Sequence, residues 1–153
     1  MNRLKALVLL LMVALPAVGE EEFEWRKLYV GGGFGSVEVP QVSETQSALQ
    51  IFVGYPLERI SSHYVLSVET GYIDVSDYPY SRYWGTAVLT HVFSSELELS
   101  LRLGVEAGNN RGFFTPTAAL GVSHRLDDAR AIRLEVIERA DSPSVFLNLL
   151  YHP

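Results

Sequence analysis

The stretch Leu97–Ala107 reads Leu-Glu-Leu-Ser-Leu-Arg-Leu-Gly-Val-Glu-Ala, and its alternation decides the fold class. Every odd position is aliphatic, and every even position is polar or glycine. Successive side chains of a β-strand point to opposite faces, so the stretch predicts a strand with one apolar face and one polar face. Its eleven residues make it longer than an ordinary strand and match the roughly 9–11 that cross a bilayer at a tilt.

Seven other stretches of the chain alternate in a similar way. The predicted strands are Leu28–Val39, Ser47–Tyr55, His63–Val75, Tyr83–Phe93, Pro116–Arg125, Arg130–Glu138 and Val145–Tyr151. The links between them are too short for parallel crossovers, so consecutive strands must pair antiparallel. Eight such strands close readily into a barrel that has no open edge. The sequence therefore predicts an all-β fold, an eight-stranded antiparallel up-and-down transmembrane β-barrel.

The first predicted strand is rich in glycine, with the run Tyr29-Val-Gly-Gly-Gly-Phe-Gly35. A nucleotide-binding glycine loop would lead into a helix and carry Lys-Ser or Lys-Thr, and this run does neither. Glycines inside a strand instead mark tight curvature or a close approach of the backbone.

The N-terminus has the three parts of a secretory signal. Arg3 and Lys5 provide positive charge, 6–15 is an apolar run, and Ala17-Val18-Gly19 has the small-x-small form of a cleavage site. The apolar run is shorter than the ~18 residues of a spanning helix. We expect residues 1–19 to be a signal peptide cleaved near Gly19, and residues 20–153 to form the barrel domain.

The composition excludes several classes of function. Without Arg3 and Lys5, 10 of the 12 basic residues remain against 18 acidic ones, a net charge of −8, which argues against a nucleic-acid partner. Lys27 is then the only lysine, whereas a water-facing surface usually mixes lysine and glutamate. The chain has no cysteine, so disulfides, thiolate metal sites and a cysteine nucleophile are excluded. No cofactor is implied.

Alternation alone fits two kinds of barrel. A soluble, exported, lipocalin-like barrel has its apolar face inside and binds a ligand there, whereas a transmembrane barrel has its apolar face outside. The ends of the apolar faces favour the second kind, because aromatic residues gather there as in the two girdles of a membrane barrel. One rim would carry Tyr55, Tyr64, Phe93 and Tyr151, and the other rim would carry Tyr72 and Tyr83.

These features together resemble the small outer-membrane β-barrel family, the OmpA-like transmembrane domain and its opacity-type relatives. The resemblance covers the whole chain after the leader and is carried by the glycine run and by Val53-Gly-Tyr55, Glu69-Thr-Gly-Tyr72, Leu103-Gly-Val-Glu-Ala-Gly108 and Leu120-Gly-Val122. We expect a monomer that is located in the outer membrane of a Gram-negative type cell envelope and contacts outer-membrane lipids. The loops predicted at the outer end of the barrel, 40–46, 76–82, 108–115 and 139–142, are short, which leaves little surface for specific recognition.

The last strand carries a further implication of this resemblance. Members of the family are inserted by the barrel-assembly machinery, which reads the last strand. The corresponding residues here are Val145, Leu147, Leu149 and Tyr151. His152 and Pro153 follow the aromatic residue, where the family usually ends on it.

In the transmembrane orientation the polar faces line the lumen. The charged residues predicted to face inward are Glu69, Glu98, Arg102, Glu106, Arg125, Arg133 and Glu135. Charges in a narrow lumen must pair, because an unpaired buried charge costs roughly 3–5 kcal/mol. We expect a structural network that fills the lumen; a gated ion path is the alternative, although an eight-stranded interior is nearly filled by side chains.

The sequence offers little for catalysis. Some eight-stranded barrels resemble lipid A hydrolases, which use a His-x-Ser pair, but none of His63, His91, His124 and His152 has a serine at that spacing. Ser123 and His124 are adjacent, so their side chains lie on opposite faces of a strand. No histidine–carboxylate spacing suggests a metal site. We expect a non-enzymatic barrel with a structural, envelope-integrity or interaction role; an outer-membrane lipid A-modifying enzyme is the alternative.

Overall fold

The computed structural model describes residues 27–39, 44–76, 81–108, 111–139 and 143–153. The expected signal peptide, residues 1–19, lies outside these ranges. The described residues form eight strands: β1 Tyr29–Val39, β2 Glu44–Arg59, β3 Tyr64–Val75, β4 Ser81–Val92, β5 Leu97–Gly108, β6 Arg111–Arg125, β7 Arg130–Arg139 and β8 Ser144–Tyr151. None of the described segments is a helix long and apolar enough to cross a membrane.

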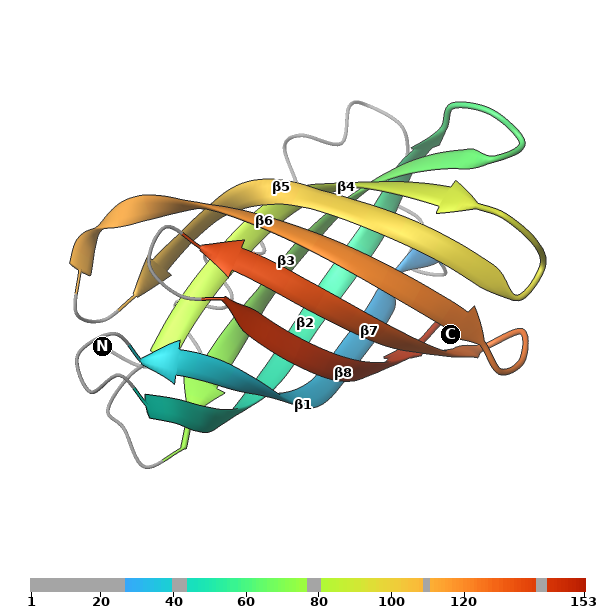
Figure 1. Ribbon diagram of the computed structural model, residues 1–153. Helices are drawn as coiled ribbons and strands as arrows, with labels where there is room; N and C mark the ends of the chain where they lie inside the picture. Colours follow the sequence, from blue (N-terminus) through green and yellow to red (C-terminus); the bar gives the residue numbers. More distant parts are fainter. Residues whose placement is uncertain (1–26, 40–43, 77–80, 109–110, 140–142) are drawn as a thin grey trace.

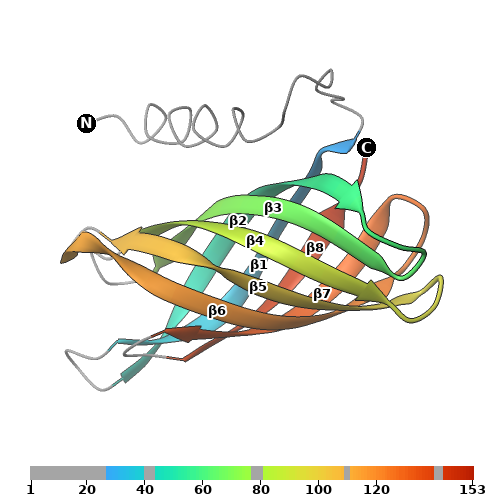
Figure 2. The same cartoon turned by 90° about the horizontal axis from the view of Figure 1, so that it is seen from above.

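The strands follow one another around a closed barrel in sequence order, and every neighbouring pair is antiparallel. β8 closes the barrel against β1, from Val30 opposite Tyr151 to Val37 opposite Ser144 (Figure 1). Figure 2 shows the strands tilted against the barrel axis, as closure of a sheet requires. The predicted fold class is confirmed.

Two strands are longer than the alternation predicts. The sequence places a turn at 56–62 and a loop at 108–115, but β2 continues to Arg59 and β6 begins at Arg111. Both strands contain a proline near the expected boundary, Pro56 and Pro116. The β2–β3 register shifts between Pro56 and Glu58, and a bulge is a place where a strand tolerates a residue that cannot donate to the ladder. Pro56 therefore marks an irregularity within β2 rather than its end, whereas Pro116 pairs in regular register with Val105 on β5.

The two faces of the barrel have opposite polarity. On β5 the aliphatic side chains point outward and the polar ones inward, so that Leu103 is 56% exposed while its neighbour Arg102 is 3% exposed. The same alternation runs along β7 and β8. This arrangement is the reverse of a soluble barrel, since leucine, isoleucine and valine cover the outside and charged groups lie at the centre.

The glycines of β1 have a local cause. A Cβ atom at Gly33 would collide with the carbonyl oxygen of Leu147 and with Asn148 on β8. A Cβ at Gly54 on β2 would collide with the ring of Tyr29. Glycine therefore permits the close approach of backbone and large inward side chains at the closure of the barrel.

The outward apolar face makes a prediction about stability in lipid. Leu103→Arg places a cation near the middle of the β5 apolar row and is expected to cost about 2–4 kcal/mol, whereas Leu97→Arg, on the same face at the strand end, is expected to cost about 0–1 kcal/mol. Urea unfolding of the two variants in phospholipid vesicles measures the difference. Equal effects at the two positions would contradict the transmembrane orientation.

Candidate functional site in the barrel lumen

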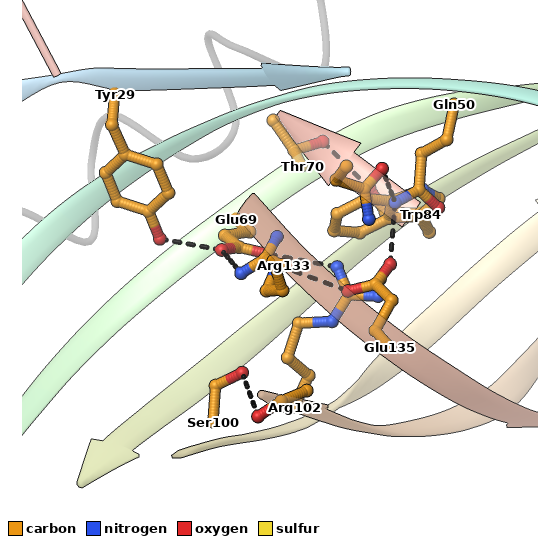
Figure 3. A network of polar contacts seen from close by, with 11 residues as sticks. Tyr29, Gln50, Glu69, Thr70, Trp84, Ser100, Arg102, Arg133 and Glu135 are labelled. Carbon is orange, nitrogen blue, oxygen red and sulfur yellow. Dashed lines mark hydrogen bonds and ion pairs between the residues drawn. The ribbon is translucent and has the colours of Figure 1, made fainter. Parts of the chain in front are cut away.

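Glu69, on β3, is the centre of the polar groups inside the barrel. Its side chain is fully buried and accepts hydrogen bonds from Arg133 Nη1 at 2.7 Å and from Arg102 Nη1 at 3.0 Å. Tyr29 Oη donates to the same carboxylate at 2.7 Å (Figure 3). Two guanidinium groups and a phenol therefore surround one carboxylate.

A second carboxylate completes the cluster. Glu135, on β7, accepts from Arg102 Nη2 at 3.0 Å and from Gln50 Nε2 at 2.7 Å. Arg133 Nε also lies 3.4 Å from Glu135 Oε2. We call Glu69, Arg102, Arg133 and Glu135 the central network. Its two positive and two negative charges balance.

The central network connects opposite walls of the barrel. Glu69 comes from β3 and Arg133 from β7, which are four strands apart in a closed ring of eight and therefore face each other across the lumen. Arg102 comes from β5, midway between them. Long side chains from three walls meet at one point on the axis, so the network obstructs the passage.

Large rings cover the network. The guanidinium carbon of Arg102 lies 4.5 Å from the centre of the Trp84 ring, and that of Arg133 lies 4.6 Å from the centre of the Phe52 ring. Such cation–π contacts are stronger where water is excluded. Towards the ends of β1 and β3 away from the chain termini, the lumen is filled by further buried side chains: Val37, Ile73, Val75, Ile137 and Phe146.

Little empty space remains in the lumen on the side of the central network away from the chain termini. A cavity of about 10 Å³ lies between Trp84, Thr86, Arg102 and Glu106, close to the ~10–15 Å³ that one water needs. Trp84 Nε1, Thr86 Oγ1 and Arg102 Nε are buried there without a protein partner. The polar atoms and the space suit a single water and no wider passage.

The other three predicted lumen charges, Glu98, Glu106 and Arg125, lie in two separate ion pairs. Glu106 pairs with Arg82, and both side chains are buried. Glu98 pairs with Arg125 at 2.8 Å, where the side chains are 23% and 43% exposed. Arg102 contacts neither Glu98 nor Glu106 in these pairs, since residues four apart on a strand are separated by roughly 13 Å.

The end of the barrel that carries both termini is open. A cavity of about 380 Å³ extends from the central network towards the chain termini and reaches the turns that join β4 to β5 and β6 to β7. We call it the vestibule. Its polar lining includes Arg59, Ser67, Thr90, Glu98, Ser123, Arg125 and His152.

His152 lies at the mouth of the vestibule. The backbone nitrogen of His152 donates to Ala129 O at 2.7 Å, and its ring stacks on Tyr29 with 5.1 Å between ring centres. Burial, and then the charge of Arg125, hold the pKa of the His152 imidazole below its usual range. The ring is therefore uncharged at neutral pH.

The six predicted rim aromatics have different positions. Tyr64, Phe93 and Tyr151 are exposed, and Tyr72 packs on Tyr83 with 4.9 Å between ring centres. Tyr55 differs from the expectation, because only 8% of its surface is exposed, although it pairs in regular register with Val68 on β3.

Ser123 and His124 lie on opposite faces of β6, as the alternation predicts. Ser123 is buried and lines the vestibule, whereas His124, the next residue, is exposed on the other face of β6. His91, whose face the sequence leaves open, points outward and lies 4.6 Å from Tyr64 between ring centres. No group of three histidine, aspartate or glutamate side chains among the described residues could hold a metal ion.

The predicted insertion signal lies on the outer surface. Val145, Leu147, Leu149 and Tyr151 are all exposed on the outward face of β8. The alternate residues Phe146 and Asn148 are buried in the lumen.

Several lumen residues escape sequence reasoning. Arg82 falls in a predicted loop, although it continues the inward parity of Trp84 and Thr86 on β4; extending the alternation by one residue would have found it. Tyr29 and Gln50 are uncharged, so the pattern of charged residues does not predict their place in the lumen cluster. The alternation along β1 and β2 places both side chains on the inward face. Their partners on β3 and β7 depend on the tilt and stagger of the strands.

Comparison with known proteins supports the fold. No family model and no curated protein matches the sequence. Among solved structures, a de novo designed transmembrane β-barrel matches with TM-score 0.65 and 18% identity, over 86% of this chain and 98% of its own. The outer membrane enzyme PagL matches with TM-score 0.64 and 11% identity, over 80% and 98%. The Yersinia pestis outer membrane protein Ail matches with TM-score 0.57 and 10% identity, over 81% and 97%.

These likenesses define the class. The chain has the fold of the small eight-stranded outer-membrane β-barrels, to which the sequence pattern also points. The group includes an enzyme and a designed protein, so the fold does not determine an activity.

The central network makes a prediction about stability. Arg102→Ala leaves Glu69 and Glu135 each short of one cationic partner in a buried site and is expected to lower the unfolding free energy by about 3–5 kcal/mol. Arg125→Ala, the matched control, breaks the partly exposed pair with Glu98, which is worth about 0–1 kcal/mol. The heat-dependent gel shift of the folded barrel reports both. An unchanged melting temperature for Arg102→Ala would contradict a structural network.

Proposed function

We propose that the protein is an outer-membrane barrel with a structural, envelope-integrity or interaction role, and that it is not a wide pore. The observation that carries this proposal is the closed lumen. The central network crosses the axis, apolar side chains fill the space beyond it, and the cavity above it measures about 10 Å³. A barrel closed in this way exposes an apolar outer surface and two rims, so its contacts are with lipids and neighbouring envelope components.

The polarity of the two faces supports the membrane location. A lipocalin-like barrel needs an apolar cavity and a charged exterior. Here the buried charged residues include Glu69, Arg102 and Arg133, while leucine, isoleucine and valine side chains cover the outside. The likeness to outer-membrane barrels points the same way.

The location and the closed lumen are tested together. We expect full-length protein to remain with the outer membrane after salt and carbonate washes, because its exterior is apolar. Reconstituted in planar bilayers, it should give no sustained open-channel current, because buried side chains fill the lumen. Recovery in the soluble fraction without detergent would contradict the membrane location, and a stable large conductance would contradict the closed lumen.

The outward row of β8 is proposed as the segment that the barrel-assembly machinery recognises. Tyr151 ends this row at the rim that carries the chain termini. Tyr151→Ala removes the exposed ring and leaves the lumen contacts of Phe146 and Asn148 in place.

We expect Tyr151→Ala to reduce the amount of folded protein in the outer membrane several-fold, while the purified variant, refolded in detergent, melts within a few degrees of the original protein. The matched control is Tyr64→Ala, which removes an exposed ring from the same rim but from β3. Equal loss of membrane insertion in the two variants would contradict a special role for β8.

A further inference from the structure

The vestibule is a blind pocket. It measures about 380 Å³ and is bounded at its inner end by Tyr29, Ser67 and Arg133. Arg133 and Tyr29 are fixed there by their hydrogen bonds to Glu69. A molecule can enter and leave only at the mouth. The volume lies within the ~300–1,000 Å³ of small-molecule sites.

Hydroxyl groups dominate the polar wall. The vestibule is lined by Ser67, Thr90, Ser94, Ser95, Ser100 and Ser123, from five elements of the barrel end. Ser94 Oγ caps its own turn, Ser100 Oγ bonds to Gly121 O, and the Ser67 hydroxyl bonds to Tyr29. This leaves the hydroxyls of Thr90, Ser95 and Ser123 to face the cavity. A hydroxyl both donates and accepts hydrogen bonds, so this wall complements a ligand that carries hydroxyl groups itself.

The charges of the vestibule wall balance. Arg59 and Arg125 are matched by Glu98 and Asp128, while the charge of Arg133 is held by Glu69. His152 is uncharged at neutral pH for the reasons given above. The wall therefore has no excess charge with which to select a strongly anionic or cationic ligand.

The Glu98–Arg125 pair is suited to contact a ligand. It is partly exposed, so its net contribution to stability is small and its remaining donors and acceptors are available. A carboxylate can accept from two hydroxyl groups, and a guanidinium can donate to ring or hydroxyl oxygens. Apolar side chains lie among these polar groups: Pro56, Val65, Val92 and Leu150, together with the Tyr29–His152 stack. Pyranose rings present the same mixture of hydroxyl edges and C–H faces.

We propose that the vestibule binds one unit of a neutral polyhydroxylated molecule, a sugar, which enters at the end of the barrel that carries the chain termini. This site goes beyond the proposed function and depends on the vestibule alone, not on where the barrel is located. The same chemistry is offered by a free sugar and by the terminal unit of a longer glycan.

The test uses full-length protein folded in an amine-oxide detergent, because detergents with sugar headgroups would compete. Calorimetric or NMR titration with glucose and with N-acetylglucosamine should give saturable binding. Glu98→Gln and Ser123→Leu should each weaken it about tenfold or more, the first by removing a charge-assisted hydrogen bond and the second by filling the cavity. His124→Leu, the adjacent residue on the outer face, is the control and should leave the affinity unchanged.

Two further probes make the outcomes decisive. Glucose 6-phosphate binding more than tenfold tighter than glucose would overturn the neutral-ligand assignment and indicate an anion site at Arg59. Failure of both neutral sugars to saturate the original protein, or equal binding by Ser123→Leu that retains its heat-dependent gel shift, would overturn the site. A linear chitooligosaccharide that binds as well as N-acetylglucosamine assigns the end of a glycan, and weaker binding assigns the free sugar; both outcomes retain the sugar site.

Discussion

The structure depends on one requirement, that charges placed in the middle of a barrel be fully paired. Glu69 has no exposed surface on its side chain and satisfies its two oxygens with Arg102, Arg133 and Tyr29. In a barrel with a polar interior and an apolar exterior, these contacts replace the apolar core of a soluble protein. They join strands that are not neighbours in the sheet, so they hold the cross-section of the barrel as well as its centre. The closed lumen is a consequence of the same pairing, since the side chains that meet on the axis occupy it.

The central network also divides the lumen into two unlike halves. On the side away from the termini, Val37, Ile73, Ile137 and Phe146 form an apolar filling around the Arg82–Glu106 pair. On the side of the termini, the polar vestibule remains open. The lumen is therefore filled at one end and open at the other. This arrangement is compatible with a structural role in the membrane and, independently, with a ligand at the open end.

Sequence reasoning reached the fold because alternation with period two is a local property. The polarity of Leu97–Ala107 fixes which side chains share a face, and eight such stretches with short links admit few topologies. The strand ends are harder to predict from sequence, because Pro56 and Pro116 lie within strands that a proline would normally interrupt. The partners of individual charges cannot be predicted from alternation either. In the sequence Arg102 lies between Glu98 and Glu106 on one strand, whereas in the barrel it contacts Glu69 and Glu135 from β3 and β7. Only the tilt and stagger of the closed barrel bring those residues together.

The transmembrane orientation requires that the aliphatic face of Leu97–Ala107 meets lipid while Glu98, Arg102 and Glu106 point inward. The chain has no cysteine, so a single spin label can be placed at each position of β5 without removing a native thiol. The most direct measurement is the collision rate of each label with lipid-soluble oxygen and with a water-soluble nickel complex in phospholipid vesicles. We expect the collision rate with oxygen to alternate with period two and to peak at Leu99, Leu101, Leu103 and Val105. Peaks at the even positions, or nickel contact at the odd positions in the middle of the strand, would contradict it.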